Sequence, residues 1–235
     1  MTHVYGIDEA GRGPILGPMA LAVVLLDPDR AARLTELGVT DSKRFGAGEK
    51  AQEARATLAA QIRQIAVAVD VELVEVDTID EHTFRGRLNH LEREVACRLL
   101  GRLSCPRDAL IYCDGARLFG PLRLQYPRLE AHDNGESVHV AVAAASILAK
   151  HARDSAFARI GERYFPQFGK LSGGGYCNAA TRRFLDAYAA AHGGLPPEAR
   201  KSWGAEKLPD EQLPLVDLSP ETAPLPAAVE ARAPA

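Results

Sequence analysis

The 235-residue chain has few of the features that mark membrane, secreted or zinc-binding proteins. No apolar run approaches the roughly 20 residues that a membrane-spanning helix needs. The opening MTHVYGIDEAGRG lacks the basic start, apolar stretch and small-residue cleavage site of a secretory signal. The four cysteines form no CxxC pair and no zinc-finger spacing with histidine. We therefore expect a cytoplasmic protein with reduced thiols, and by default a monomer.

Two nucleotide-binding signatures are missing as well. The segment AGRGPILGP at 10–18 lacks the GK[ST] of a P-loop and is not a GxGxxG before a helix. An ATPase or a dinucleotide-binding protein is therefore a poor interpretation. A loop in which Arg12 stands between Gly11 and Gly13 is better suited to close backbone approach to a sugar or a phosphate.

Charge and proline are unevenly distributed along the chain. From Ala205 onward there are six acidic and two basic residues, so the overall net charge of -3 becomes +1 for residues 1–204. That balance permits binding to a phosphate backbone without demonstrating it. Residues 205–235 are rich in proline and alanine and contain no aromatic residue, which predicts a disordered acidic tail after one folded domain, 1–204.

Hydrophobic periodicity predicts an α/β domain with a mixed sheet flanked by helices. Alternating or continuous apolar residues predict strands at 3–9, 19–26, 66–76 and 109–113. Helical spacing or composition predicts helices at 49–64, 88–99, 137–160 and 178–191. The first two strands are close enough to form a hairpin across the glycine-rich loop, and Asn178 is a candidate N-cap for the last helix.

Three carboxylates stand where predicted strands end. Asp8 and Glu9 close the first strand, and Asp114 follows the apolar segment 109–113. Adjacent acids usually mark a solvated surface and Asp-Gly usually marks a turn, so neither feature suffices alone. Together they suggest acids converging at one edge of the sheet, although neighbouring strand residues point to opposite faces. Oxygen ligands of this kind suit Mg²⁺, and two such ions about 4 Å apart can drive phosphodiester cleavage.

The segment GIDEAGRGPILGP resembles the opening signature of type 2 ribonuclease H, the ribonuclease HII family. The resemblance continues in the family's order with TDSK at 40–43, CDG at 113–115, AVAAASILAKHARD at 141–154 and GY at 175–176. It spans residues 4 to about 203 and implies a ribonuclease H-like fold with a small helical C-terminal part. It also implies cleavage of RNA in RNA–DNA hybrids and two-metal incision 5′ of single ribonucleotides in DNA, with Mg²⁺ or Mn²⁺, leaving 3′-hydroxyl and 5′-phosphate ends.

The resemblance assigns roles to particular residues. The catalytic metal ligands would be Asp8, Glu9, Asp114 and Glu136. The residues in contact with nucleic acid would be Gly11, Arg12, Gly13, Ser42, Lys43, Lys150 and Tyr176. Of these, the glycine–arginine–glycine loop would read the ribose 2′-hydroxyl, which distinguishes RNA from DNA. Tyr176 would pack on the neighbouring deoxyribose, and the serine and lysines would contact phosphates.

The fourth acid departs from the family pattern. The family usually has Asp ten residues before the serine of AASI, where this chain has Glu136, one methylene longer. Asp133 is the alternative ligand, and a nucleic-acid-binding module with weakened catalysis is the alternative function. ESVHVAVAAASI also resembles type 3 ribonuclease H. That type normally carries an extra N-terminal domain, and its loop lacks the Gly-Arg-Gly reading, so type 2 is preferred. A junction resolvase would leave this loop and Tyr176 unexplained.

Three smaller features complete the comparison with the family. ARKSW at 199–203 replaces the more usual HRRSF and keeps its basic and aromatic character. Asp154 is expected to be a structural partner for a nearby base. QLPLVDL at 212–218 resembles the short peptides with which bacterial replication proteins bind the sliding clamp.

Overall fold

The sheet of the protein is mixed, as the sequence predicts. The computed structural model describes residues 3–39 and 49–204, and its five strands have the order β3-β2-β1-β4-β5. They are β1 (Val4–Ala10), β2 (Met19–Leu26), β3 (Ala68–Val74), β4 (Leu110–Asp114) and β5 (Leu129–His132). The first three pair antiparallel, whereas β4 runs parallel to β1 and β5 runs parallel to β4. The antiparallel pairing of β1 with β2 is the predicted hairpin.

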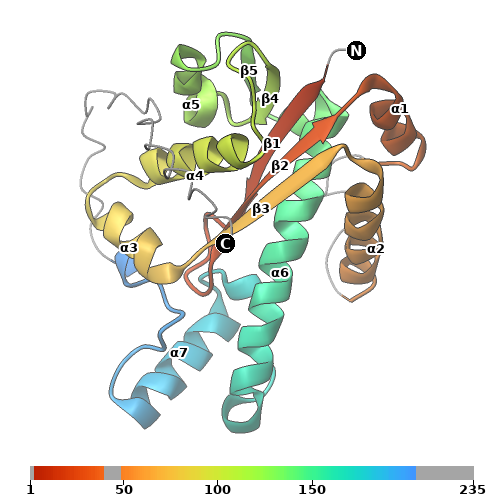
Figure 1. Ribbon diagram of the computed structural model, residues 1–235. Coiled ribbons are helices and arrows are strands. Elements are labelled where there is room, and N and C mark those ends of the chain that lie inside the picture. The colour runs from red at the N-terminus through yellow and green to blue at the C-terminus, as the bar shows by residue number, and fades with distance from the viewer. Residues whose placement is uncertain (1–2, 40–48, 205–235) are drawn as a thin grey trace, which may run out of the picture.

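Helices cover both faces of the sheet (Figure 1). They are α1 (Pro28–Glu36), α2 (Glu49–Ile65), α3 (Val76–Phe84), α4 (Leu88–Arg102), α5 (Ala116–Phe119), α6 (Val140–Phe168) and α7 (Ala179–His192). The 3-10 turns are η2 (Gly120–Leu124), η3 (Gly135–Ser137), η4 (Gly173–Gly175) and η5 (Lys201–Gly204). Among the residues described, no helix combines the length and apolar character needed to cross a membrane.

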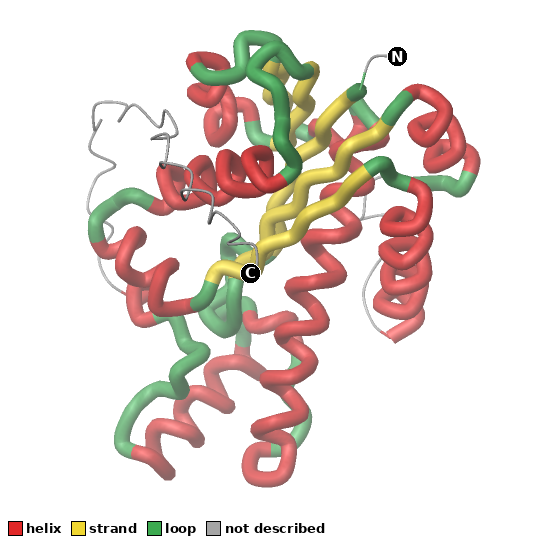
Figure 2. Tube along the Cα trace, viewed as in Figure 1, coloured by secondary structure: helices red, strands yellow, loops and turns green. Residues whose placement is uncertain are grey.

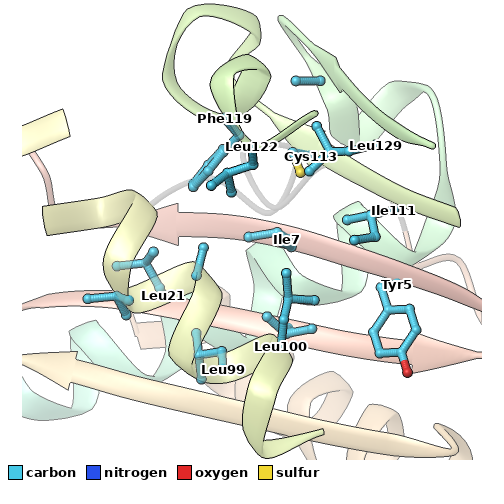
Figure 3. Packing of buried hydrophobic residues seen from close by; sticks show 14 of the residues in the cluster. Tyr5, Ile7, Leu21, Leu99, Leu100, Ile111, Cys113, Phe119, Leu122 and Leu129 are labelled. Atoms are coloured by element: carbon cyan, nitrogen blue, oxygen red, sulfur yellow. The ribbon is translucent and has the colours of Figure 1, made fainter. Parts of the chain in front are cut away.

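Large apolar side chains fill the face under α4 (Figure 3). Ile7 of β1 and Leu21 of β2 are fully buried in one cluster with Leu99 and Leu100 of α4. Successive residues of a strand point to opposite faces of the sheet. The odd-numbered positions of β1 therefore face α4, and the even-numbered positions face α6.

Small residues bring α6 close to the other face. Its segment 141–149 is buried and rich in alanine, and it packs in one cluster with Leu34 of α1 and Ile62 of α2. A Cβ atom added at Gly6 would lie only 2.1 Å from the carbonyl carbon of Ala141. Glycine at this position therefore lets the helix approach β1 directly, just before the strand reaches Asp8.

The long helix α6 continues past the sheet and lies beside α7 (Figure 2). Ile160 of α6 forms a separate apolar cluster with Phe184 and Leu185 of α7, and with Leu16 and Ala199. This is the predicted helical C-terminal part, and Asn178 caps α7 as expected by accepting from the amides of residues 180 and 181 at 3.0 Å. The cluster also brings the glycine-rich loop next to residues near 199.

Some boundaries differ from those predicted. The helix expected at 137–160 begins only at Val140, because residues 135–137 form a separate 3-10 turn, and it ends at Phe168, with Pro166 inside its final turns. The strand expected at 66–76 ends at Val74, and α3 starts at Val76. Helices α1 and α3 and the four-residue β5 were not predicted. The predicted tail, 205–235, lies outside the described residues.

Candidate active site

Three carboxylates meet at the edge of the sheet where its parallel strands end. Asp8 lies near the end of β1, Asp114 is the last residue of β4, and Glu136 is in η3, after β5. One oxygen atom from each lies within 4.8 Å of the others. The carboxyl ends of parallel strands share one edge of a sheet, so the topology brings together acids that are up to 128 positions apart.

The turn that carries Glu136 is fastened to the end of β4. Asp114 Oδ1 accepts a hydrogen bond of 2.7 Å from the amide of Gly135. A Cβ atom added at Gly135 would lie 2.7 Å from the carbonyl oxygen of Cys113, so only glycine allows this approach. Asp133, the alternative fourth acid, instead accepts a hydrogen bond of 3.0 Å from the amide of Ala116. The geometry therefore brings Glu136 into the acid group in preference to Asp133.

Glu9 lines the same pocket but does not belong to the group of three converging acids. Asp8 points toward Ser146 of α6, and the Glu9 side chain stays within hydrogen-bond reach of the Asp8 carboxylate. Glu9 instead lies on the α4 side, where it is close to the charges of Arg12 and of Glu92. Glu9 thus lies beside Asp8 without belonging to the converging group, and a role for Glu9 as a metal ligand stays a prediction.

Burial and mutual repulsion make Asp8 and Glu9 reluctant to ionise. Burial raises the pKa of Asp8 well above its ordinary value, the charge of Glu9 raises it further, and Asp114 adds a smaller contribution. Burial also raises the pKa of Glu9, which Arg12 opposes. A bound cation would relieve this accumulation of negative charge. The donor set consists of carboxylate oxygens only, which is the chemistry that hard divalent ions prefer, so the site fits such an ion.

The acids open into a pocket of about 420 Å³, whose wall includes the loop Gly11–Gly13 and Tyr176. Gly13 lies against the tyrosine ring, because a Cβ atom added there would be 3.3 Å from Cε1. The ring itself is 53% exposed at the rim. A flat apolar surface therefore lies beside the loop, and the role of Tyr176 in packing on a sugar stays a prediction.

Side chains of α4 hold Arg12 in place. Its guanidinium pairs with the fully buried Glu92 and donates to Asn89 Oδ1 at 2.6 Å. Burial raises the pKa of Glu92 to about 7, and the charge of Arg12 opposes this shift. Sequence analysis missed Glu92, since one acid on an ordinary helix gives no signal until α4 is packed on the sheet.

Basic residues line the wall formed by α6 and α2. Lys150 pairs with Asp154, and Asp154 also binds Arg55 at 3.3 Å and Arg153 at 3.7 Å. The expectation that Asp154 is a structural partner for a base is confirmed. Arg55 lines the pocket but was not predicted, because it reaches the site only through the packing of α2 on α6. Ser42 and Lys43 lie outside the described residues.

Comparisons with known proteins match this chain to one family over nearly all of its folded part. A family profile described as Ribonuclease HII matches residues 5–205. Ribonuclease HII of Thermococcus sibiricus is 35% identical over 216 residues, which cover 88% of this chain and 91% of that protein. The crystal structure of ribonuclease H2 from Pyrococcus horikoshii has 29% identity and a TM-score of 0.70, covering 86% of this chain and 94% of that one. A structure of the PCNA:RNase HII complex from Archaeoglobus fulgidus has 31% identity and a TM-score of 0.71, covering 85% and 93%.

Proposed function

Because the chain belongs to the ribonuclease HII family and is therefore a metal-dependent ribonuclease H acting on RNA–DNA hybrids, we propose that it also incises DNA at single embedded ribonucleotides. The cut lies on the 5′ side of the ribonucleotide and leaves 3′-hydroxyl and 5′-phosphate ends. The type 2 assignment is confirmed over type 3 by the family match. Its substrate is nucleic acid inside the cell, and we propose a cytoplasmic location.

One observation carries the proposal: the converging carboxylates of Asp8, Asp114 and Glu136 open into the same pocket as the loop Gly11–Gly13 and Tyr176. Acids that can hold cations thus lie next to a backbone that can approach a sugar closely. In this arrangement the loop receives the ribose 2′-hydroxyl and Tyr176 packs on the next deoxyribose. The scissile phosphate then lies over the acids.

The acids divide the work of holding metal ions. Asp8, Asp114 and Glu136 would hold Mg²⁺ or Mn²⁺, and Glu9, which lines the same pocket beside Asp8, would contribute a further carboxylate. When bound, a pair of such ions supplies activation of the attacking water and charge stabilisation at the leaving 3′ oxygen. Lys150 lies on the pocket wall, where its ammonium group attracts the phosphate backbone, and Asp154 holds it in place.

Three labelled duplexes of the same sequence test this function. One carries a single ribonucleotide, one is an RNA–DNA hybrid, and one is all DNA. In Mg²⁺ or Mn²⁺ the protein should cut the first at one position, cut the second at several, and leave the third intact. Mapping the product ends checks the side of the cut. Cutting of the hybrid without incision at the single ribonucleotide would restrict the activity to hybrids, and cutting of the all-DNA duplex would contradict recognition of the ribose.

We also propose that QLPLVDL at 212–218 binds a sliding clamp, although these residues lie outside those described. The Archaeoglobus fulgidus relative was solved as a complex with PCNA, which supports the proposal. The full chain should bind an immobilised clamp, and the full chain with Leu213→Ala and Leu215→Ala should not. A control with Leu225→Ala, further along the same tail, should bind like the unaltered protein. Equal binding by all three would contradict the proposal.

A further inference from the structure

A short segment near the C-terminal end of the described chain forms hydrogen bonds to the carbonyl groups of the glycine loop. We call residues Arg200–Trp203 the clasp. Arg200 donates to the carbonyl oxygens of Gly11 at 2.6 Å, Arg12 at 2.8 Å and Gly17 at 2.8 and 3.0 Å. Trp203 donates from Nε1 to the carbonyl oxygen of Gly13 at 2.9 Å. All three carbonyls of the loop Gly11–Gly13 therefore accept hydrogen bonds from the clasp.

These bonds determine which way the peptide groups of the loop face. A trans peptide is planar, and its C=O points opposite to the N–H of the following residue. The described chain contains no cis peptide bond. Because the clasp binds the carbonyls of Gly11 and Arg12, the amides of Arg12 and Gly13 are directed away from it. The loop itself lines the pocket, so the clasp sets the backbone orientation that a sugar hydroxyl would meet there.

The clasp is itself anchored to the body of the protein. Asp80 of α3 accepts hydrogen bonds from the amides of Lys201 at 2.9 Å and Ser202 at 3.0 Å, and from the Ser202 hydroxyl. The Arg200 guanidinium stacks over the Trp203 ring, with 4.9 Å from Cζ to the ring centroid. Arg200 is 1% exposed, and burying such a charge is costly unless its donors are bonded. Here two of the four hydrogen bonds go to the loop Gly11–Gly13, and the other two go to the carbonyl oxygen of Gly17.

We propose that Arg200 and Trp203 are positioning residues that hold the loop in the orientation that distinguishes a ribose from a deoxyribose. The inference rests on the proposed function of that loop. The contribution of Trp203 is specific to this chain, since the family more often has phenylalanine at this position. Phenylalanine has no N–H, so the hydrogen bond to Gly13 is a third restraint that this chain adds to those of Arg200.

The test replaces Trp203 with phenylalanine in the full chain, which removes the donor and keeps an aromatic ring over Arg200. Metal-free binding to a labelled duplex with one ribonucleotide, and to the same duplex in DNA, is measured by fluorescence anisotropy. The ratio of the two affinities, which is the ribonucleotide preference, should fall roughly 2- to 10-fold in Trp203→Phe, the contribution of one hydrogen bond. In cleavage, the loss should appear in KM for the single-ribonucleotide duplex and leave kcat for a long hybrid unchanged.

Two further variants separate positioning from general stability. Tyr164→Phe also removes one aromatic donor, here to Glu198 Oε2 at 2.7 Å in the cluster beside α7, and should keep the preference unchanged. Asp80→Asn weakens the anchor without touching the loop, and should lower the preference in the same direction as Trp203→Phe. A preference kept in Trp203→Phe, or lost equally in Tyr164→Phe, would overturn the inference. A wild-type protein without any preference would instead overturn the proposed function of the loop.

Discussion

Two of the walls of the active-site pocket differ in the groups that stabilise them. On one wall, the carboxylates of Asp8, Asp114 and Glu136 converge, and burial together with the charges of Glu9 and Asp114 raises the pKa of Asp8, so a bound cation would stabilise this wall. On the other wall, the carbonyls of the loop Gly11–Gly13 are bound by the clasp, so the protein supplies every partner itself. The acid wall is organised for chemistry that depends on a ligand, and the loop wall is organised for rigidity.

This difference suggests that cutting and recognition can be damaged separately. Substitutions in the acid wall should abolish cleavage and spare the preference for a ribonucleotide. Substitutions around the loop wall should reduce the preference and spare cleavage of long hybrids. Each of the following variants tests one side of that division.

The largest effect is expected for Asp8→Asn. The amide keeps the size of the side chain but removes one charge from the converging acids. Cleavage should fall by more than about 100-fold, because even residues that only orient metal ligands typically cost roughly 10- to 100-fold. Ribonucleotide preference in binding should stay within about twofold, as for independent sites. A loss of preference as large as the loss of cleavage would show that the two walls are coupled.

The next effect is expected for Tyr176→Ala. The ring is more than half exposed beside Gly13, so its removal should hardly change the melting temperature. Incision at a single ribonucleotide should fall about tenfold, since one aromatic stacking contact to a nucleic acid contributes roughly 1–3 kcal/mol. Cleavage of a long hybrid should fall less. Tyr176→Phe keeps the ring and serves as the control; equal losses on both substrates would remove the proposed role of Tyr176.

The strength of a sequence signal determined which parts of the fold could be predicted. The continuous apolar run at 19–26 gave β2, the shorter segments at 3–9 and 109–113 gave β1 and β4, and Asn178 marked the start of α7. The short β5 was missed, because LEAH at 129–132 is too brief to show a period and becomes a strand only by pairing with β4. For helix α1 the sequence did offer signals, an N-cap residue at Asp27 followed by Pro28. In the structure Asp27 accepts a hydrogen bond of 2.8 Å from the amide of Arg30.

Sequence also predicted more of the acid wall than of its supports. Asp8 and Asp114 stand at strand ends, and the spacing from Ser146 singled out Glu136, which the geometry places beside them. The supports depend on contacts across the chain: Arg200 reaches carbonyls 183 to 189 positions away. Buried side chains that bind backbone carbonyls leave no local pattern, so only the folded structure could identify them.

A smaller effect is expected for Glu136→Asp, which installs the family's usual acid on this chain's own turn. The turn is fixed by the bond from Gly135 to Asp114, so a shorter side chain should draw its oxygens away from the group by about one C–C bond length, ~1.5 Å. Half-maximal cleavage should then need roughly tenfold more metal, the lower end of the cost of disturbing a metal site. Titration with Mg²⁺ and with Mn²⁺ measures this shift, and Glu136→Gln provides the charge-free comparison. Tighter metal binding by Glu136→Asp would contradict the expected geometry.

The smallest effect on cleavage is expected for Glu92→Gln, and there the informative measurement is stability. Glu92 lies between the two walls, close to Glu9 and paired with Arg12. Burial raises its pKa from 4.5 to about 7. As pH rises through that interval, the unfolded chain releases the proton before the folded protein does. The folded state therefore binds more protons, and the free energy of unfolding falls as pH increases.

Wild-type protein should accordingly lose roughly 2–3 kcal/mol of stability relative to Glu92→Gln between about pH 4.5 and 8, at 1.36 kcal/mol per unit of pKa. Denaturant unfolding of the metal-free proteins at several pH values measures this difference. Glu81→Gln is the matched control, because Glu81 pairs with Arg85 at the surface and stays in solvent. If the free energy of unfolding of Glu92→Gln followed that of the wild-type protein at every pH, the charge of Arg12 would fully offset the cost of burying the Glu92 carboxylate. The pairing with Arg12 would then stabilise the ionised form of Glu92 without a bound cation, as the clasp satisfies the loop carbonyls without a ligand.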